Sequence, residues 1–349
     1  MAFQRAIDLA RGQSNRMLEM RTLLAAAGVD FYHARFDGAA ERSLRALDIA
    51  RETDVILGIA AGSWFSGLCL SALGDLEQAE VCARSGLEPA ERLRDRTWLG
   101  RVCLTNHYVC LYRGDFRAAR EYAERGLAVV PDDSRLLFLS AVNECETGNQ
   151  DAANAYLERT IAGLARAPSA AATEYANTAW AVAAVVTISG DTRHLDTGER
   201  AAQMVLSEPR APEFYRCIAR LALGLLAAMR GDAKAAAEHY HELRDSVRGL
   251  LPVVTLGDRM LGRLAHTMGD IVQATVHFEE ALAFCRKGGY RPELAWTCCD
   301  YADMLLERES GGDRAKAMSL LDESLAISSE LGMRPLMERV LSRREILGA

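Results

Sequence analysis

Apolar helical stretches alternate along this chain with short polar turns, and the turns recur at a long, fairly regular spacing. Six turns carry the dipeptide Gly-Asp, a seventh reads Gly-Asn, and a weaker first copy reads Ala-Arg-Phe-Asp. They fall at 34–37, 74–75, 114–115, 148–149, 190–191, 231–232, 269–270 and 312–313, so that successive steps span 34 to 43 residues. A self-similar period of this length predicts an array of helical hairpins.

The Gly-Asp dipeptide has a physical reason at the bend of a helical hairpin. Glycine adopts the left-handed conformation that ends one helix, and the side chain of Asp or Asn caps the start of the next. Five residues after the turn, every copy has alanine except the fifth, which has Leu195. Seven residues before the turn, most copies have Ala or Gly, whereas His107 and Leu305 interrupt this column. Small side chains at both positions predict antiparallel helices that approach each other closely.

These features and phrases such as Phe278-Glu-Glu-Ala281-Leu282 resemble the tetratricopeptide repeat over nearly the whole chain. The stride exceeds the usual length of that repeat, and the aromatic residue near the start of the first helix is mostly missing. In these respects the chain is similar to the long-stride repeats of bacterial signalling ATPases and LuxR-type regulators. The resemblance implies an all-α fold, a right-handed superhelical solenoid of antiparallel helix pairs with about eight repeats and a C-terminal capping helix.

The two ends of the chain differ from the repeats between them. We expect a repeat array over 1–332, in which residues 1–12 resemble the second half of a truncated repeat that lacks its first helix. We expect a capping helix over 333–349, opened by Pro335. On this interpretation the chain is the repeat region of a larger protein whose other modules perform the chemistry.

Composition and charge narrow the classes of function. Half of the residues are hydrophobic but only 7% are aromatic, which favours Ala- and Leu-rich helices with almost no strand. A net charge of -7 argues against a direct nucleic-acid partner and against an anionic membrane surface. The longest apolar segment that we identify, Ala179 to Ile188, is too short to cross a bilayer. Nine cysteines without a Cys-x-x-Cys pair suit a reducing, cytoplasmic location and a role as core filler.

The motifs of catalysis and cofactor binding are missing. No lysine follows a glycine, which excludes a Walker-type phosphate loop, and the glycine motifs of dinucleotide-binding proteins and serine hydrolases are also absent. His239 and His241 are two residues apart and would point to different helix faces, so they do not form a zinc pair. We therefore predict no enzyme, no cofactor and no metal site. An enzyme whose site is hidden in the loops stays open as another class.

By the resemblance, the first helices line a concave groove that takes an extended or helical segment of a partner. Arginine and aromatic residues carry most interface energy, so such residues on the solvent face of first helices are the candidates for partner binding. They are Arg101, Tyr108, Tyr112, Arg135, Asn177, Trp180, Arg259, Arg263 and His266. The last three share one face by their i, i+4, i+7 spacing. Tyr108 and Trp180 have the alternative of packing in the core between repeats.

The function that follows is a non-catalytic interaction or effector-sensing scaffold, the repeat region of a bacterial signalling or transcriptional regulator. It is expected to bind a peptide, a protein or a small effector in the concave groove. The alternative is a structural spacer or a module that self-associates through its truncated N-terminal repeat.

Overall fold

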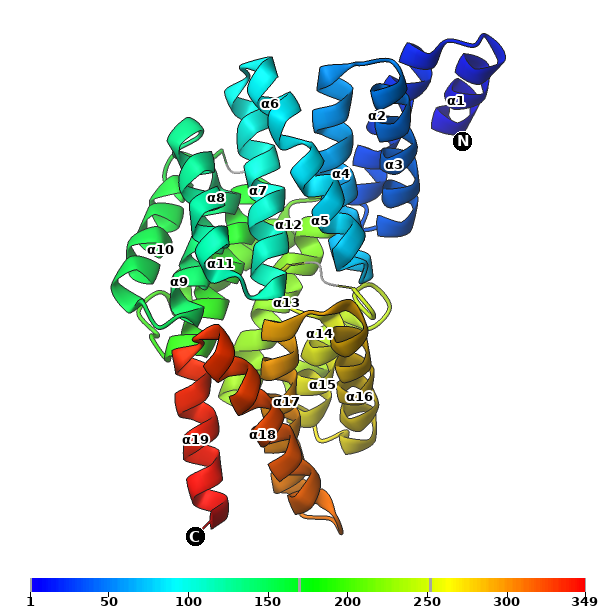
Figure 1. Ribbon diagram of the computed structural model, residues 1–349. Helices are drawn as coiled ribbons and strands as arrows, with labels where there is room; N and C mark the ends of the chain where they lie inside the picture. Colours follow the sequence, from blue (N-terminus) through cyan, green and yellow to red (C-terminus); the bar gives the residue numbers. More distant parts are fainter. Residues whose placement is uncertain (1, 169–170, 251–252, 349) are drawn as a thin grey trace.

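The protein is an array of antiparallel helix pairs. A computed structural model describes residues 2–168, 171–250 and 253–348, with the backbone alone at 2 and 346–348; Met1 and Ala349, the outer ends of the predicted segments, lie outside this range. The described residues form nineteen helices and, apart from them, one isolated antiparallel bridge between Val253 and Thr255. The predicted all-α fold of helix pairs is thus confirmed (Figure 1).

Each pair consists of a first helix and a second helix that returns beside it. The pairs are α2 (Arg16–Tyr32) with α3 (Phe36–Glu52), α4 (Ile56–Leu73) with α5 (Leu76–Ser85), α7 (Arg96–Arg113) with α8 (Phe116–Val129), α9 (Ser134–Glu146) with α10 (Gln150–Leu164), α11 (Ala172–Ser189) with α12 (Leu195–Ser207), α13 (Glu213–Arg230) with α14 (Ala233–Leu243), α15 (Gly257–Thr267) with α16 (Ile271–Gly288), and α17 (Arg291–Arg308) with α18 (Asp313–Leu331). Outside the pairs lie α1 (Ala2–Gly12), α6 (Leu87–Leu93) and α19 (Arg334–Gly348).

The bend between α4 and α5 shows how the local sequence makes a hairpin. Gly74 ends α4 with a φ of 95°, a left-handed conformation that a side chain would strain. Asp75 then caps α5, because its Oδ1 accepts a hydrogen bond from the backbone N of Gln78 at 3.1 Å. The bend between α11 and α12 is longer: Asp191 binds Arg193 instead of capping, and α12 begins only at Leu195.

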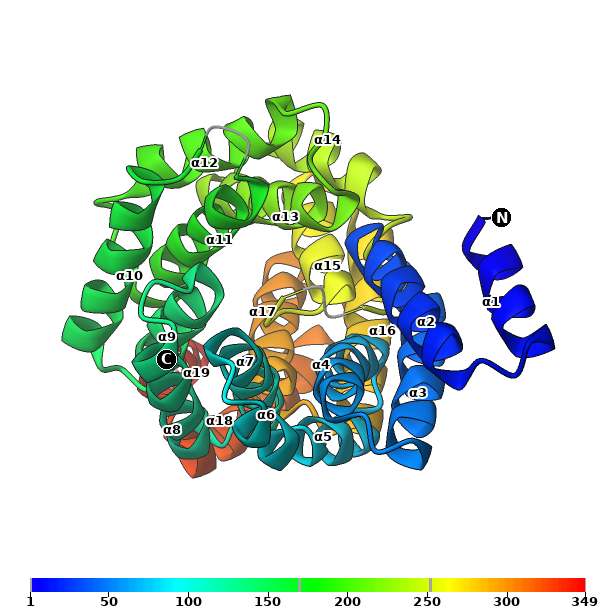
Figure 2. The ribbon, with the colours of Figure 1, turned by 90° about the horizontal axis from the view of Figure 1, so that it is seen from above.

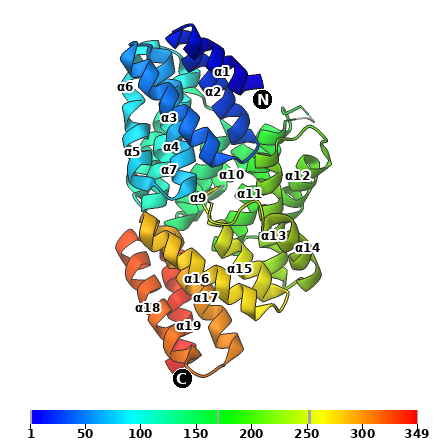
Figure 3. The ribbon, with the colours of Figure 1, turned by 90° about the vertical axis from the view of Figure 1, so that its right-hand side faces the viewer.

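The helix pairs wind into a right-handed superhelix with the first helices inside. Seen from above in Figure 2, the chain runs clockwise from α1 and moves away from the viewer. Five pairs complete one turn, since the aromatic ring of Phe284 in the seventh pair lies against Gly74 in the second, and Leu331 in the eighth lies against Gly114 in the third. The lower helices α15 to α19 therefore lie beneath the upper ones (Figure 3).

Side chains hydrogen-bond the second turn of the superhelix to the first. The hydroxyl of Tyr290 donates to the carbonyl of Ser71 at 2.7 Å, and the hydroxyl of Tyr112 donates to the carbonyl of Val253 at 3.1 Å. The closure is visible in the accessible surface, 14808 Å², because a compact monomer of this mass exposes roughly 14,000 Å² and an open solenoid would expose more. The expected open groove is therefore replaced by an enclosed interior.

Glycine makes close packing between consecutive pairs possible. A Cβ atom at Gly62 of α4 would lie 2.9 Å from Cβ and 3.0 Å from Cα of Leu47 in α3, whereas a Cβ at Gly163 of α10 would meet nothing within 4 Å. We expect Gly62→Ala to lower the free energy of unfolding by about 1–3 kcal/mol, because the backbone of α3 must move. Gly163→Ala is the control and should be neutral or stabilise by up to about 1 kcal/mol. Urea denaturation of both variants tests this; equal effects would show that the helices separate freely.

One described helix is long and apolar enough to cross a membrane by length and composition. This helix is α4. The expectation that Ala179 to Ile188 is the longest apolar segment was therefore wrong. Other helices bury 72% of α4, which is typical of a core helix. All nine cysteines are free, and eight are buried while Cys110 is half-buried, as expected of core filler.

Candidate ligand-binding cavity

A cavity opens among the first helices, and we call it the axial cavity. The space between its walls measures about 610 Å³ when the open solvent at its mouth is included. The last turn of α2, the start of α3, one stripe each of α4 and α7, the first turn of α9, the second turn of α11 and the first two turns of α13 form its walls. The lining residues are Phe31, Tyr32, Phe36, Trp64, Leu68, Ala72, Leu104, Tyr108, Tyr112, Arg135, Asn177, Phe214, Tyr215 and Ile218.

Aromatic side chains dominate this wall. They make up eight of the fourteen lining residues, whereas they are 7% of the chain, so their gathering is a property of the cavity and not of the composition. Helical spacing explains part of it: Leu104, Tyr108 and Tyr112 follow one another at intervals of four along α7 and share a face. Such a concave aromatic surface with few polar groups is typical of a small-molecule site.

The axial cavity lies across the seam at which the superhelix closes on itself. Phe31 of α2 meets Phe214 of α13 with ring centroids 4.9 Å apart, and Tyr32 meets Tyr215 at 6.0 Å. These pairs join the first and the sixth helix pair, which are far apart in the sequence. A ligand here would contact both sides of a noncovalent seam.

The polar groups of the wall are few and are held in place. Arg135 donates from Nε to Oδ1 of Asp133 at 2.9 Å, and the amide of Asn177 donates to the hydroxyl of Ser134 at 3.0 Å. Burial acts to raise the pKa of Asp133, but the hydrogen bonds and charge of Arg135 outweigh it and lower the pKa. Among the described residues, those that line the cavity include no Asp or Glu.

Arg101 stands at the rim of the axial cavity. It lies on the same face of α7 as Leu104 and Tyr108, one turn nearer the helix start. Its guanidinium carbon is 4.9 Å from the ring centroid of Trp64 and 4.8 Å from that of Trp98. Burial lowers the pKa of Arg101, and the nearby charge of Arg135 adds to the effect.

The structure therefore brings five of the predicted residues to one place, with Tyr108, Tyr112, Arg135 and Asn177 in the wall and Arg101 at the rim. Their expected position on an open, solvent-facing surface is corrected for Tyr112 and Asn177, which are buried. Both are covered because the first helices curve around the axis and shield one another.

Trp180, Arg259 and Arg263 line a second, smaller cavity below the first. Trp180 is buried, which agrees with the alternative of core packing, whereas the expected exposure of Arg259 is wrong because that residue is also buried. Arg259 is paired twice, with Oε2 of Glu293 at 3.0 Å and Oδ2 of Asp300 at 2.8 Å, so its charge is compensated inside the protein.

Side chains that line the second cavity also form a polar contact between the two turns of the superhelix. Trp296 of α17 donates its indole N–H to both carboxylate oxygens of Glu146 in α9, at 2.9 and 3.0 Å, and Arg259 lies over the Trp296 ring. Burial raises the pKa of Glu146 to about 7 in spite of the Trp296 hydrogen bond and the charge of Arg259. Glu146, Trp296 and Arg259 contact one another, which assigns them to the packing of the superhelix. The buried Nε1 of Trp180 in this cavity has no hydrogen-bond partner among the described residues.

His266 lies apart from both cavities, in an open polar cleft with Asp300, Asp303 and Arg339. Its Nε2 is 2.9 Å from Oε2 of Glu307 on α17, so it faces the next helix pair. The three residues predicted to share one face therefore differ in burial: Arg259 is buried, whereas Arg263 and His266 are partly buried and line the same polar cleft.

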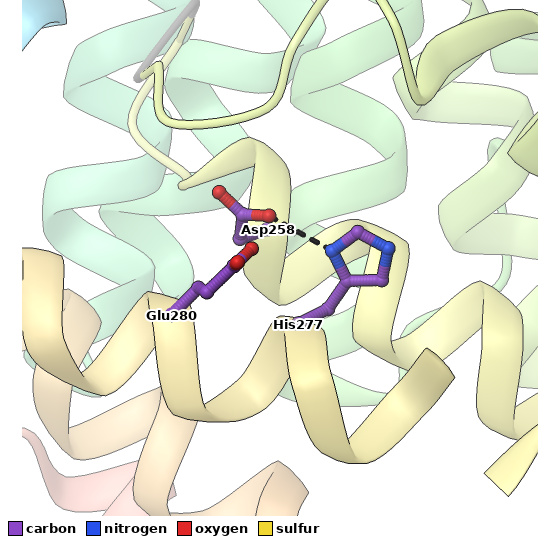
Figure 4. A group of neighbouring side chains, drawn as sticks. All are labelled: Asp258, His277 and Glu280. Atoms are coloured by element: carbon purple, nitrogen blue, oxygen red, sulfur yellow. Dashed lines mark hydrogen bonds and ion pairs between the residues drawn. The ribbon is translucent and has the colours of Figure 1, made fainter. Parts of the chain in front are cut away.

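One group of described side chains has the composition of a metal site: Asp258, His277 and Glu280 (Figure 4). Its ligand atoms are already used. Asp258 accepts from Nδ1 of His277 at 2.8 Å and from the backbone N of Gly249 at 2.6 Å, and Nε2 of His277 is 3.1 Å from the Tyr240 hydroxyl. Arg248 pairs with Glu280 and lies 3.9 Å from Asp258, so a cation is present. We interpret the group as an anchor for the segment before α15.

Sequence reasoning missed most of the aromatic wall, namely Phe31, Tyr32, Phe36, Trp64, Phe214 and Tyr215. The adjacent pairs Phe31-Tyr32 and Phe214-Tyr215 were a signal, since aromatic residues are scarce in this chain. Their meeting depends on the superhelical turn, which the sequence did not reveal.

Comparisons with known proteins add little to this picture. No protein-family model matches the chain, and no curated protein matches it in sequence. Among solved structures, the crystal structure of the P58(IPK) TPR domain matches over 99% of both chains, at 15% identity and a TM-score of 0.25. A score this low supports no inference, so the fold assignment rests on the helix pairs described above.

Proposed function

We propose that this chain is a non-catalytic sensing module that binds a small molecule in its axial cavity, as part of a larger cytoplasmic signalling or transcriptional regulator of bacterial type. The observation that supports the proposal is the convergence of eight aromatic side chains on one hollow, with no Asp or Glu among the described residues that line it. A small molecule suits this hollow better than an extended peptide, because the second turn of the superhelix closes the groove.

The position of the cavity suggests how binding would be sensed. A ligand that contacts Phe31 and Phe214 together bridges the seam between the first and the sixth helix pair. Since a ligand stabilises the state that binds it, occupancy would favour the closed superhelix over any opened form. Other domains of a regulator would then respond to the change in the geometry of the helix array.

Titration with indole, followed by calorimetry, tests the proposal. We expect indole to bind the wild-type chain, and we expect Ala72→Leu to weaken binding about tenfold or more, because the larger side chain fills the axial cavity. Ala184→Leu is the matched control, since Ala184 lines the second cavity and the same substitution should leave indole binding unchanged. Thermal melts show whether both variants are folded. No indole binding, or equal weakening by the two variants, would contradict the proposal.

The second candidate function is self-association through the N-terminal end. Apolar side chains are exposed there, with Leu9 at 58% and Met17 at 45% exposure, and α1 projects from the array (Figure 1). A mass that rises with concentration in light scattering, and that falls back to the monomer on Leu9→Glu substitution, would favour this alternative.

A further inference from the structure

We infer that the ligand of the axial cavity is a small amphipathic anion, with a ring-containing apolar body among the aromatic side chains and one carboxylate paired with Arg101. This inference rests on the proposed function and specifies the chemistry of its ligand.

The state of Arg101 is the first reason. The other partly or fully buried arginines of the described residues have a carboxylate or carbonyl partner: Arg259 has two carboxylates, Arg135 has Asp133, and Arg216 donates to three carbonyls. Arg101 is half-buried without either kind of partner, and its buried Nε has no hydrogen bond among the described residues. A desolvated cation without a counter-ion is costly to maintain and favours an anion.

A second and independent reason is the indole of Trp64. This side chain lines the axial cavity and is only 5% exposed, yet its Nε1 has no acceptor among the described residues. A buried N–H donor without a partner is rare in folded proteins. A carboxylate oxygen of a ligand would satisfy it, and the Arg101 guanidinium stacks on the same indole ring.

The charges around the cavity disfavour a cationic ligand. An aromatic cage can also hold a cation, through the negative faces of its rings. Here Arg135 lines the wall, Arg101 occupies the faces of Trp64 and Trp98, and no described lining residue is acidic. Arg135 is paired with Asp133, but Arg101 has no carboxylate partner. A cationic ligand would therefore meet the uncompensated charge of Arg101, and a neutral one would leave Arg101 unpaired.

Three probes with one ring system test the inference: indole, 3-indolepropionate and tryptamine, which are neutral, anionic and cationic. We expect wild-type protein to bind 3-indolepropionate about tenfold or more tightly than indole, and tryptamine more weakly than indole. Arg101→Met keeps the aliphatic stem between the two tryptophans and removes the charge. It should bring the ratio of the 3-indolepropionate affinity to the indole affinity close to one, and Arg101→Lys should restore part of the preference.

Arg113→Met is the matched control, because Arg113 lies at the far end of the same helix, is exposed and is paired with Glu80. It changes the net charge equally and should leave the preference intact. Equal wild-type affinity for indole and 3-indolepropionate overturns the inference but leaves the proposed function standing, whereas no binding of any probe overturns both. If Arg101→Met weakens all three probes equally, Arg101 acts in packing alone and the inference fails. If that variant does not fold, the wild-type probe series decides.

Discussion

Arg259→Ala is expected to lower the free energy of unfolding by about 3–5 kcal/mol, the largest effect of any single substitution considered. The change removes the partner of two carboxylates, Glu293 and Asp300, which are both buried and would be left with poorly compensated charge. It also removes the guanidinium that lies 5.3 Å from the Trp296 ring centroid, at the contact between the superhelical turns. Urea denaturation monitored by circular dichroism gives the measurement.

The control is Arg117→Ala. Arg117 and Glu121 form an exposed pair at 3.8 Å on α8, and such pairs contribute less than about 1 kcal/mol. Repeat arrays can unfold in steps, so the transition should also be followed by tryptophan fluorescence. A loss for Arg259→Ala no greater than that for Arg117→Ala would mean that the buried network does not hold the turns together.

Glu146→Gln is expected to make the protein less sensitive to alkaline pH. Burial raises the pKa of Glu146 to about 7 from its ordinary value of 4.5, so the folded state binds a proton more readily than the unfolded state. Stability from this group is therefore complete below about pH 4.5 and is lost as the pH rises through about 7. Glutamine carries no charge at any pH and still offers an oxygen to the Trp296 indole.

The stability difference between Glu146→Gln and the wild type should therefore grow in favour of the variant by about 3 kcal/mol between pH 4.5 and pH 8. Glu293, the buried carboxylate on the other side of Arg259, is present in both proteins, so the comparison isolates Glu146. Glu121→Gln, at an exposed site, should show no such trend. If the stability difference between Glu146→Gln and the wild type does not change with pH, Glu146 has an ordinary pKa and is not buried between the turns.

The helix pairs could be predicted because they depend on local chemistry. Gly74 and Asp75 make a bend within a few residues, through a left-handed glycine and a side-chain cap, and the bend leaves its mark on the sequence wherever it recurs. The array of antiparallel pairs follows from that repetition.

The closure of the array could not be predicted, because it depends on contacts between residues far apart in the chain. Tyr290 hydrogen-bonds to Ser71 across 219 positions and Trp296 to Glu146 across 150. The number of pairs in a turn decides these contacts, and small changes in the rotation of each pair alter it.

The candidate site was also predictable in part: the residue types could be predicted, but the burial of the residues could not. The sequence indicated polar and aromatic residues of first helices as candidates for binding, and four of them, Tyr108, Tyr112, Arg135 and Asn177, line one cavity. The burial of Arg259 could not be predicted, because its partners Glu293 and Asp300 belong to the following helix pair and are far from it in the sequence.

We propose the axial cavity, and not the second cavity or the outer surface, as the binding site. The four tryptophans allow a direct test: Trp64 lines the axial cavity, Trp180 and Trp296 line the second one, and Trp98 lies beyond Arg101. Fluorine NMR of protein labelled with 5-fluorotryptophan, assigned with Trp→Phe variants, reports on each position during titration with indole. We predict that the Trp64 resonance shifts with saturation while those of Trp180 and Trp296 stay in place. Shifts at Trp180 or Trp296 with Trp64 unmoved would contradict the account.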